Sequence, residues 1–446
     1  MKAPLPEDIL KRLSNRIATS NRILYYPILV KSASGCTITD QAGKEYIDFN
    51  ASWTVAGLGY SNPEIIEAIK VEIESSAGLA TCTFPNETVL KFADELVSIT
   101  PGDFAKKVWF GHSGGDACAA AYKLLPISTK RPRSLAFYGG MHGTDLAGIA
   151  MGSHPSTTKF AVPSLVAKVP YAYCYRCPYG LEYPSCGVYC ASDFIEEQTF
   201  KYVSVPDETS FMLVEPMQSD AGDIVPPKEY LSKLKKTCEK FGILFVSDEV
   251  KVAPSRTGKL LGVENYGVIP NAVALGKSIA SGMPVGALVA QKGLLDSGFL
   301  SSTLAGNSIA AAAGVATIRL LKKESLLNNV NEVGAGLLKR LEEIKERHEI
   351  VGDVRGKGLF AGIEFVKDRK TKTPAKIETA KIVYRSWQLG LITVFVGADQ
   401  NVLEVTPPLI ITREEVDRGV DILEQAISDV EKGLVPDSLV KDFGGF

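Results

Sequence analysis

Short apolar runs alternate with amphipathic stretches through the middle of the chain, from about residue 86 to residue 297. Each apolar run ends at a polar or glycine-containing turn, a pattern typical of parallel strands that are connected by helices. The pattern therefore predicts an α/β fold whose large domain is a mainly parallel, doubly wound sheet. We expect its strands at residues 108–110, 134–137, 212–214, 243–246 and 273–275, with a crossover helix at 231–241.

A different pattern follows the predicted sheet and indicates a second, smaller domain. Residues 304–321 form an alanine-rich stretch that predicts a long helix leaving the large domain, and residues 330–348 have the apolar period of another helix. The sequence thus divides into a large domain at 61–320 and a smaller α+β domain built from both chain ends, 1–60 and 321–446. The remaining expected elements are a turn and strand at 352–365, a strand at 402–405 and a helix at 414–432.

Composition and charge limit the class of partner. The 446 residues are 45% hydrophobic, and 49 Lys and Arg against 51 Asp and Glu give a formal net charge of −2. Because no overall positive field is present, we expect neither nucleic acid nor an anionic membrane as a partner. No run approaches roughly 18 apolar residues, and the chain does not open with a basic segment before an apolar core. We therefore expect a cytoplasmic protein that acts on a small molecule.

Four of the eight cysteines lie close together, at Cys174, Cys177, Cys186 and Cys190. Zinc could use thiolates at this spacing, although zinc ribbons usually pair two tight C-x2-C motifs and the last spacing here is looser. We favour a surface excursion with reduced thiols or one local disulfide, and we assign no metal site. The other four cysteines have apolar or helical neighbours and are expected to be buried: Cys36, Cys82, Cys118 and Cys238.

A lysine and an aspartate at two strand ends carry the strongest chemical signal. Lys277 follows the run at 273–275, and Asp248 ends an apolar run 29 residues earlier. A lysine supplies the amine for a Schiff base, and an aspartate can keep a pyridinium nitrogen protonated, so the pair suits pyridoxal phosphate chemistry. Each residue has a plainer alternative when it is taken alone, a surface lysine or a helix cap.

A small-residue segment supplies the third element of this chemistry. Ser113, Gly114 and Gly115 precede a helical stretch, where small residues would let backbone N–H groups approach a phosphate. An ordinary turn is the alternative for this segment taken alone, since glycine pairs mark turns very often.

These three elements, in this order, resemble the class III aminotransferase family of fold-type I pyridoxal phosphate enzymes. The resemblance covers nearly the whole chain. It implies that pyridoxal 5'-phosphate is the cofactor, that Lys277 binds it and carries protons, and that Asp248 pairs with its ring nitrogen. Four further motifs support it: Glu215-Pro216 with Asp220-Ala221-Gly222, Arg256-Thr257-Gly258, Thr303 with Gly306-Asn307, and Pro407-Pro408-Leu409.

The resemblance also implies roles for residues around the cofactor. Ser113, Gly114 and Gly115 would hold its phosphate, together with the partner subunit's threonine at position 303 in a homodimer that shares its active sites. Thr303 stands at that position in this chain. Lys251 replaces the glutamine that most members carry near the ring hydroxyl, and a cation there would stabilise a phenolate. A surface lysine at a helix start is the alternative for Lys251.

Within class III, the closest resemblance is to the amino acid amide racemases, the group that includes alpha-amino-epsilon-caprolactam racemase. Stretches such as Asp248-Glu249-Val250-Lys251-Val252 and Asn401-Val402-Leu403-Glu404 carry it. Many class III enzymes grip the substrate α-carboxylate with an arginine at the position of Glu404, so we expect an uncharged amide or lactam substrate. A solvated strand glutamate is the alternative.

The same resemblance assigns the remaining site residues. Asp220 stands where the racemases have an acid/base carboxylate, and Trp53 matches an aromatic residue that lines the substrate pocket. Met141 departs from the pattern, because it replaces a tyrosine that stacks on the cofactor and takes part in catalysis. Methionine can pack against an aromatic ring, but it cannot carry a proton.

We therefore expect racemisation of an amino acid amide or lactam, with the Cα proton removed and returned while the substrate is bound to the cofactor as an external aldimine. Lys277 and Asp220 would be the two proton carriers. The runner-up is a transaminase that moves an amino group from an amine or amino acid to a keto acid, and a decarboxylating transaminase comes third. Retention of both Lys277 and Asp248 argues against a catalytically silent binding protein.

Overall fold

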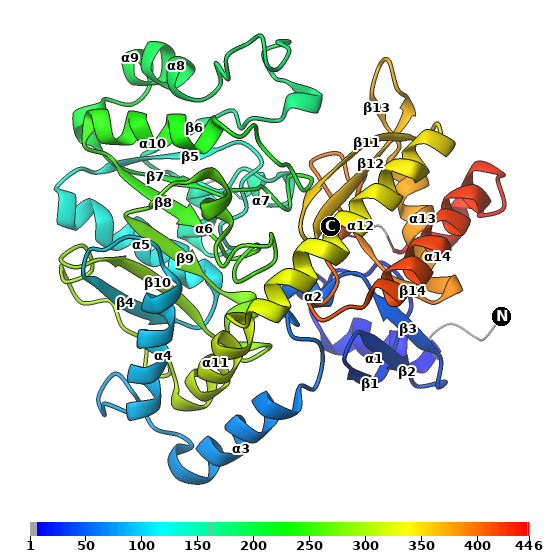
Figure 1. The fold of residues 1–446 in the computed structure, drawn as a ribbon, viewed down its shortest axis with the longest axis horizontal. Coiled ribbons are helices and arrows are strands. Elements are labelled where there is room, and N and C mark those ends of the chain that lie inside the picture. The colour runs from blue at the N-terminus through cyan, green and yellow to red at the C-terminus, as the bar shows by residue number, and fades with distance from the viewer. Residues whose placement is uncertain (1–6, 161, 444, 446) are drawn as a thin grey trace.

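The structure is a computed structural model that describes residues 7–160, 162–443 and 445 (Figure 1). Its largest sheet contains β4 (Lys106–Gly111), β5 (Arg133–Phe137), β6 (Val166–Val169), β7 (Thr209–Val214), β8 (Leu244–Asp248), β9 (Ala272–Leu275) and β10 (Gly286–Gln291). The strand order is β4-β10-β9-β8-β7-β5-β6. Neighbours pair in parallel except at β10, which is antiparallel to both β4 and β9.

The two faces of this sheet belong to two different apolar clusters. Along β7, Met212 and Val214 lie in one cluster and Leu213 lies in the other, because successive side chains of a strand point to opposite faces. Helix α5 (Gly114–Thr129) packs with Leu213, whereas α10 (Tyr230–Phe241) packs with the opposite face. The predicted mainly parallel, doubly wound sheet is therefore confirmed.

Two smaller sheets lie beside the large one, and the first joins the two ends of the chain. In this sheet β14 (Leu391–Ile392) pairs with β3 (Glu45–Asp48), followed by β2 (Thr37–Asp40) and β1 (Val30–Ser34). Figure 1 shows these blue N-terminal strands beside the orange and red C-terminal elements. The second sheet is antiparallel and contains β11 (Val351–Lys357), β12 (Phe360–Asp368), β16 (Val402–Val405) and β15 (Val394–Val396), with β13 (Thr373–Pro374) against β12.

Long helices connect and cover these sheets. The yellow α12 (Glu324–Arg347) crosses the centre of Figure 1, from the large sheet toward β11. No helix of the described residues combines the length and the apolar character needed to cross a membrane. The other helices are α1 (Glu7–Arg16), α2 (Ala51–Thr54), α3 (Pro63–Ser76), α4 (Glu87–Ile99), α6 (Leu146–Met151), α7 (Pro155–Thr158), α8 (Ser192–Phe194), α9 (Phe200–Tyr202), α11 (Ser308–Leu321), α13 (Lys376–Leu389) and α14 (Arg413–Glu431).

Most predicted elements are present, and the differences have local causes. The five strands predicted for the large sheet correspond to β4, β5, β7, β8 and β9, with β8 beginning one residue later than predicted, but β6 and the antiparallel β10 were not predicted. Residues 352–365 form a hairpin of two strands, because Gly358 turns the chain at a φ of +60°. Helix α11 begins at Ser308, four residues later than predicted, because the Asn307 side chain caps it by accepting from Ala310 N at 2.9 Å. The domain boundaries at residues 61 and 320 remain predictions.

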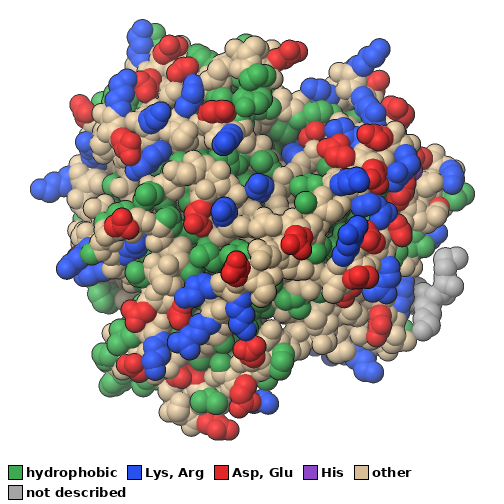
Figure 2. Space-filling model, in the orientation of Figure 1, with side chains coloured by type: hydrophobic (Ala, Val, Ile, Leu, Met, Phe, Trp, Pro, Cys, Tyr) green, Lys and Arg blue, Asp and Glu red, His purple; other side chains and the backbone are tan. Residues whose placement is uncertain are grey.

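The surface and the cysteines complete the comparison with the sequence. Figure 2 shows basic and acidic side chains interspersed over the visible face, as the near-neutral net charge predicts. Cys36, Cys118 and Cys238 are buried, but Cys82 is exposed in the single chain, so its predicted burial is wrong. Cys82 follows α3 in an irregular segment, and its thiol contacts the Thr303 carbonyl at 3.7 Å instead of entering a core.

Candidate active site

A cavity of about 720 Å³ opens at the carboxyl ends of the central strands, where ligands bind open α/β sheets. Asp248 is the last residue of β8, and Lys277 follows the end of β9 by two residues. The N-terminus of α5 closes a third side. The cavity brings together eight of the residues singled out from the sequence: Trp53, Ser113, Gly114, Gly115, Met141, Asp220, Asp248 and Lys277.

Lys277 sits at a strained point of the backbone. Its φ is +47°, a left-handed conformation that a non-glycine residue keeps only where its surroundings fix it. Gly276 allows the approach, because a Cβ at that position would lie 2.8 Å from the backbone of Gly114. Burial lowers the pKa of the Lys277 amine, and the positive charge of Lys251 lowers it further. Lys277 is therefore more readily available as a neutral amine than a surface lysine.

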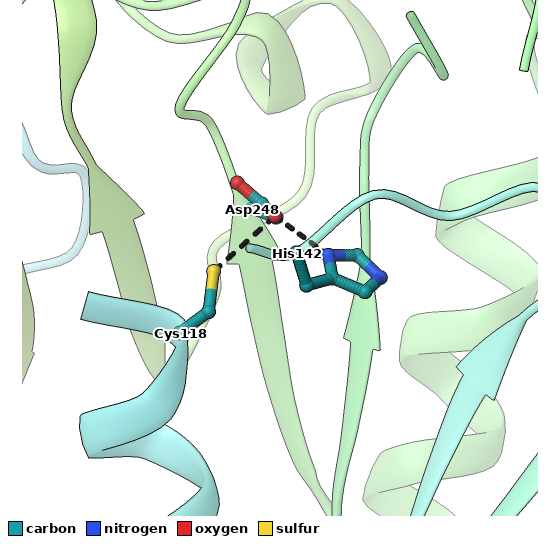
Figure 3. A group of neighbouring side chains, drawn as sticks. All are labelled: Cys118, His142 and Asp248. Atoms are coloured by element: carbon teal, nitrogen blue, oxygen red, sulfur yellow. Dashed lines mark hydrogen bonds and ion pairs between the residues drawn. The ribbon is translucent and has the colours of Figure 1, made fainter. Parts of the chain in front are cut away.

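Asp248 is oriented by two side chains that come from separate elements (Figure 3). His142 Nδ1 lies 2.7 Å from Asp248 Oδ2, and the Cys118 thiol donates to the same oxygen at 3.3 Å. Asp248 Oδ1 accepts from Val250 N at 3.1 Å. Burial alone lowers the pKa of His142, but the hydrogen bond and charge of Asp248 raise it overall. His142 was not predicted from the sequence, where its only signal was its place beside Met141.

These three side chains are the one group within the described residues whose ligand atoms lie close enough to hold a metal ion. The 2.7 Å between His142 Nδ1 and Asp248 Oδ2 is a hydrogen-bond distance. Two ligand atoms of a tetrahedral zinc ion, each at 2.0–2.1 Å, lie about 3.3 Å apart. His142 and Cys118 therefore orient the Asp248 carboxylate by hydrogen bonds in this structure.

The cysteine excursion is separate from this site. Cys174, Cys177, Cys186 and Cys190 line one small cavity, and all four are free cysteines. Burial raises the pKa of Cys174 to about 11 and that of Cys190 to about 12. Both are thiols near neutral pH, and the four do not form a ligand group among the residues described.

Close backbone contacts shape the end of the cavity at α5. Ser113 precedes the helix, and its hydroxyl accepts from Asp116 N at 3.1 Å. A Cβ at Gly114 would lie 2.4 Å from the Val250 side chain, and a Cβ at Gly286 would lie 1.8 Å from the Ser113 carbonyl oxygen. Only glycine fits these two positions, and Gly114 and Gly115 line the cavity at the N-terminus of α5. Such a helix N-terminus binds phosphate groups.

Comparison with known proteins assigns the chain that forms this cavity to a family. The model of the family described as aminotransferase class III matches residues 18–427. The chain belongs to the class III aminotransferase family.

Two similar curated proteins and one solved structure support this assignment. The chain is 36% identical to an alanine/serine racemase of Pyrococcus horikoshii, over 98% of this chain and 93% of that protein. It is 35% identical to a leucine/methionine racemase of Thermococcus litoralis, over 99% of each. A solved Bacillus anthracis aminotransferase superposes with a TM-score of 0.86 at 27% identity, over 95% of this chain and 98% of that one.

Pyridoxal phosphate is the cofactor of this class III enzyme, and the cavity fits it. The N–H groups at the start of α5 suit the phosphate, and the oriented carboxylate of Asp248 suits a protonated ring nitrogen. Lys277 lines the same cavity and supplies the amine for covalent attachment. Met141 also lines the cavity and offers a thioether in place of a proton-carrying side chain.

Lys251 and Glu404 do not line the cavity; they form a buried ion pair beside it. Lys251 Nζ lies 2.7 Å from Glu404 Oε2, and both side chains are buried. Three further donors reach the Glu404 carboxylate, from Asn50 at 3.2 Å, Ser219 at 3.2 Å and Thr406 at 3.0 Å. The Glu404 carboxylate is therefore engaged by four side chains in this structure, and its predicted contact with a substrate stays a prediction.

Thr303 also lies outside the cavity of its own chain. It is exposed, in the segment between β10 and α11. This placement leaves its predicted contact with the phosphate of a partner subunit as a prediction.

Trp53 lines the cavity from α2, which is a short left-handed helix. The four residues of α2 all have positive φ, with Ser52 at +49° and Trp53 at +59°. Left-handed helical conformation costs roughly 1–2 kcal/mol for each non-glycine residue. The surrounding contacts must offset that cost for Trp53 to keep its place.

We predict that Lys277 is the only lysine to which the cofactor is attached. Borohydride reduction followed by peptide mapping should find the pyridoxyl group on Lys277, because its amine lines the cavity that holds the Asp248 carboxylate. The variant Lys277→Arg should lose both the label and the visible absorbance. A label on Lys251 in the wild-type chain would show that the assignment is wrong.

The variant Asp248→Asn should keep bound cofactor but lose turnover by roughly a hundredfold or more, because an amide cannot hold the ring nitrogen protonated. Cys118→Ala is the matched control, since it removes only a weak thiol donor from the same oxygen. Steady-state kcat measured on both cofactor-loaded variants tests this. Equal losses in the two variants would mean that packing, and not the charge of Asp248, accounts for the effect.

Proposed function

We propose that this enzyme racemises the α-carbon of a neutral amino acid or its amide. The observation that carries the proposal is that Lys277 and Asp220 line one cavity together with Asp248. Both racemases compared above match the chain over nearly its full length, which supports the same reaction type. Racemisation needs two proton carriers, one for each face of the α-carbon.

Asp220 is the best candidate for the second proton carrier, because the other cavity carboxylates serve the fold. Asp116 accepts from His112 N at 2.7 Å, and Asp145 accepts from Gly148 N at 2.7 Å to cap α6. Asp248 is held by His142. The backbone carbonyl of Asp220 accepts a hydrogen bond from Gly397 N at 2.8 Å. The carboxylate of Asp220 forms no hydrogen bond within the described residues.

In the proposed mechanism the chain removes one proton from Cα of the bound substrate and returns a different proton to the opposite face. Pyridoxal phosphate supplies an aldehyde that condenses with amines and an electron-poor ring that stabilises a carbanion at Cα. Lys277 Nζ accepts the Cα proton on one face, and the Asp220 carboxyl group donates a proton to the other face. The reverse reaction exchanges these roles, so each enantiomer gives the other. The lowered pKa of Lys277 favours the neutral amine that accepts the proton.

The finer part of the proposal is an uncharged amide or lactam substrate, such as alpha-amino-epsilon-caprolactam. No arginine lines the cavity within the described residues, whereas Asp116, Asp145, Asp220 and Asp248 all do. A free carboxylate would meet this negative field without a bidentate partner. The names of the two racemase relatives favour free amino acids, so the form of the carboxyl group is the point to test.

Transamination is the second candidate, and Met141 favours it. A proton-carrying side chain at position 141 would give a racemase a further acid/base group beside the cofactor. Met141 lines the cavity but cannot carry a proton. The similar fold of the Bacillus anthracis aminotransferase is compatible with this alternative.

The proposal includes a homodimer in which Thr303 reaches the active site of the partner subunit. Thr303 is exposed and lies outside the cavity of its own chain. Large apolar side chains around this segment are exposed in the single chain, including Phe84, Phe299 and Leu304. Light scattering of the purified protein distinguishes this dimer from a monomer.

Racemisation without an amino acceptor is the main prediction. In deuterated water, each enantiomer of alaninamide or alanine should give the other with deuterium at Cα, while the cofactor keeps its aldehyde form. Asp220→Asn should slow both directions by roughly a hundredfold. Asp145→Asn is the control, because it makes the same charge change in the same cavity and asparagine also caps helices. Turnover that stops until a keto acid is added would establish the transaminase instead.

Met141→Tyr should preserve or raise the racemisation rate, since tyrosine adds a proton carrier beside the cofactor.

Comparison of alaninamide with alanine tests whether the substrate carries an amide or a free carboxylate. The amide should have a kcat/KM at least about tenfold above that of the free acid, because no arginine among the described lining residues can pair with a carboxylate. The opposite preference would assign the enzyme to free amino acids and leave the racemase proposal intact.

A further inference from the structure

The left-handed helix α2 carries Trp53 into the cavity wall, and its four consecutive positive φ angles require external support. Asp48 gives part of that support. Its Oδ1 accepts from Asn50 N at 2.8 Å, and its Oδ2 accepts from Ala51 N at 3.0 Å and from the Tyr60 hydroxyl at 2.7 Å. These contacts fix the start of the turn, but none of them reaches Trp53.

Asn50 connects Trp53 to the buried ion pair. Its side-chain oxygen accepts from Trp53 N at 2.7 Å, and its amide nitrogen donates to Glu404 Oε1 at 3.2 Å. An asparagine that makes both bonds has only one orientation available, because exchanging oxygen and nitrogen would place like groups together. The Glu404 carboxylate therefore determines how Asn50 holds the backbone of Trp53.

Lys251 reaches the same tryptophan from the side of its ring. Lys251 Nζ lies 4.9 Å from the ring centroid of Trp53, within the range of a cation–π interaction. The backbone of Lys251 is tied to the turn as well, because its carbonyl accepts from the Thr54 hydroxyl at 3.1 Å. One partner of the ion pair thus contacts the ring, and the other acts through Asn50 on the backbone.

We propose that Lys251 and Glu404 are positioning residues for Trp53, and that through Trp53 they set which substrate side chains fit the cavity. Neither residue lines the cavity, so their effect on specificity is indirect. The placement of Trp53 does not depend on the reaction, whereas the effect on substrates rests on the proposed function.

The proposal makes the two residues act as a unit. Glu404→Gln removes the carboxylate that pairs directly with the buried Lys251 ammonium, and Lys251→Met removes the ammonium that pairs with Glu404. Removing one partner of a buried pair is more damaging than replacing both. The double variant Lys251→Met/Glu404→Gln should therefore recover much of the stability and of the Trp53 placement that either single change loses.

The first measurement follows Trp53 directly. The chain has three tryptophans, so Trp109→Phe/Trp387→Phe leaves Trp53 as the only one. In this background and with bound cofactor, Glu404→Gln and Lys251→Met should each shift the emission of Trp53 and increase its quenching by acrylamide. The double variant should lie closer to the parent. Asn50→Ala should move Trp53 in the same way while the ion pair stays intact, which covers the case that Glu404→Gln does not fold.

The second measurement follows specificity in the otherwise wild-type chain. The ratio of kcat/KM for leucine to that for alanine, or for the two amides, should change by about tenfold in Glu404→Gln and return toward wild type in the double variant. The ratio is also measurable with 2-oxoglutarate as amino acceptor, because neither leucine nor alanine yields that keto acid. A chain that only transaminates would thus refute the proposed racemase while still testing the role of the ion pair.

Glu196→Gln is the matched control, because it breaks an ion pair with Lys240 that is exposed and remote from the cavity. It should change neither the emission of Trp53 nor the substrate ratio. If Glu404→Gln lowers the melting temperature but leaves both readouts at the values of the control, the pair stabilises the fold only and the proposal is wrong. The proposal also fails if the double variant is no closer to the parent than the single variants are.

Discussion

Burial of charge between the large sheet and the two smaller sheets is the constraint on which the rest of this structure depends. Arg256 is fully buried, donates to the carbonyls of Leu359 and Pro407, and has a pKa lowered to about 10 by burial. Burial raises the pKa of Asp48 to about 6, although several donors oppose that rise. A buried ion that loses its partner costs several kcal/mol. The sheets can therefore dock only in an arrangement that gives each buried charge its hydrogen-bond partners.

This arrangement also maintains strained backbone where the chemistry occurs. The left-handed turn of α2 costs about 4–8 kcal/mol in total if each of its four residues costs 1–2 kcal/mol. Lys277 adds another non-glycine residue at positive φ. Contacts from sequence-distant segments offset these costs, because Asn50 depends on Glu404 and Gly276 fits against Gly114. Strain and charge burial are thus coupled in one region, and a change to either affects the cavity.

The sequence predicted those parts of the site that follow from local pattern. Asp248 and Lys277 end apolar runs, and the carboxyl ends of parallel strands meet at one edge of a sheet, so their proximity was predictable. The pairing of Lys251 with Glu404 was not predictable, because it joins residues 153 positions apart whose separate patterns fit a surface lysine and a strand glutamate. His142 was missed for the same reason. Strand β10 was missed because its antiparallel pairing departs from the alternation of strand and helix.

The position of Asp220 shows how the fold can decide between the two candidate reactions. Racemisation and transamination both begin with removal of the Cα proton, and they differ in where a proton is returned. Asp220 is held through its carbonyl by Gly397, while Arg355 of β11 donates to the carbonyls of Gly222 at 2.9 Å and Asp223 at 3.2 Å. The smaller antiparallel sheet therefore sets where the Asp220 carboxylate stands relative to Lys277. Two related enzymes with the same lysine and carboxylate could differ in outcome through this docking alone, without a change in either proton carrier.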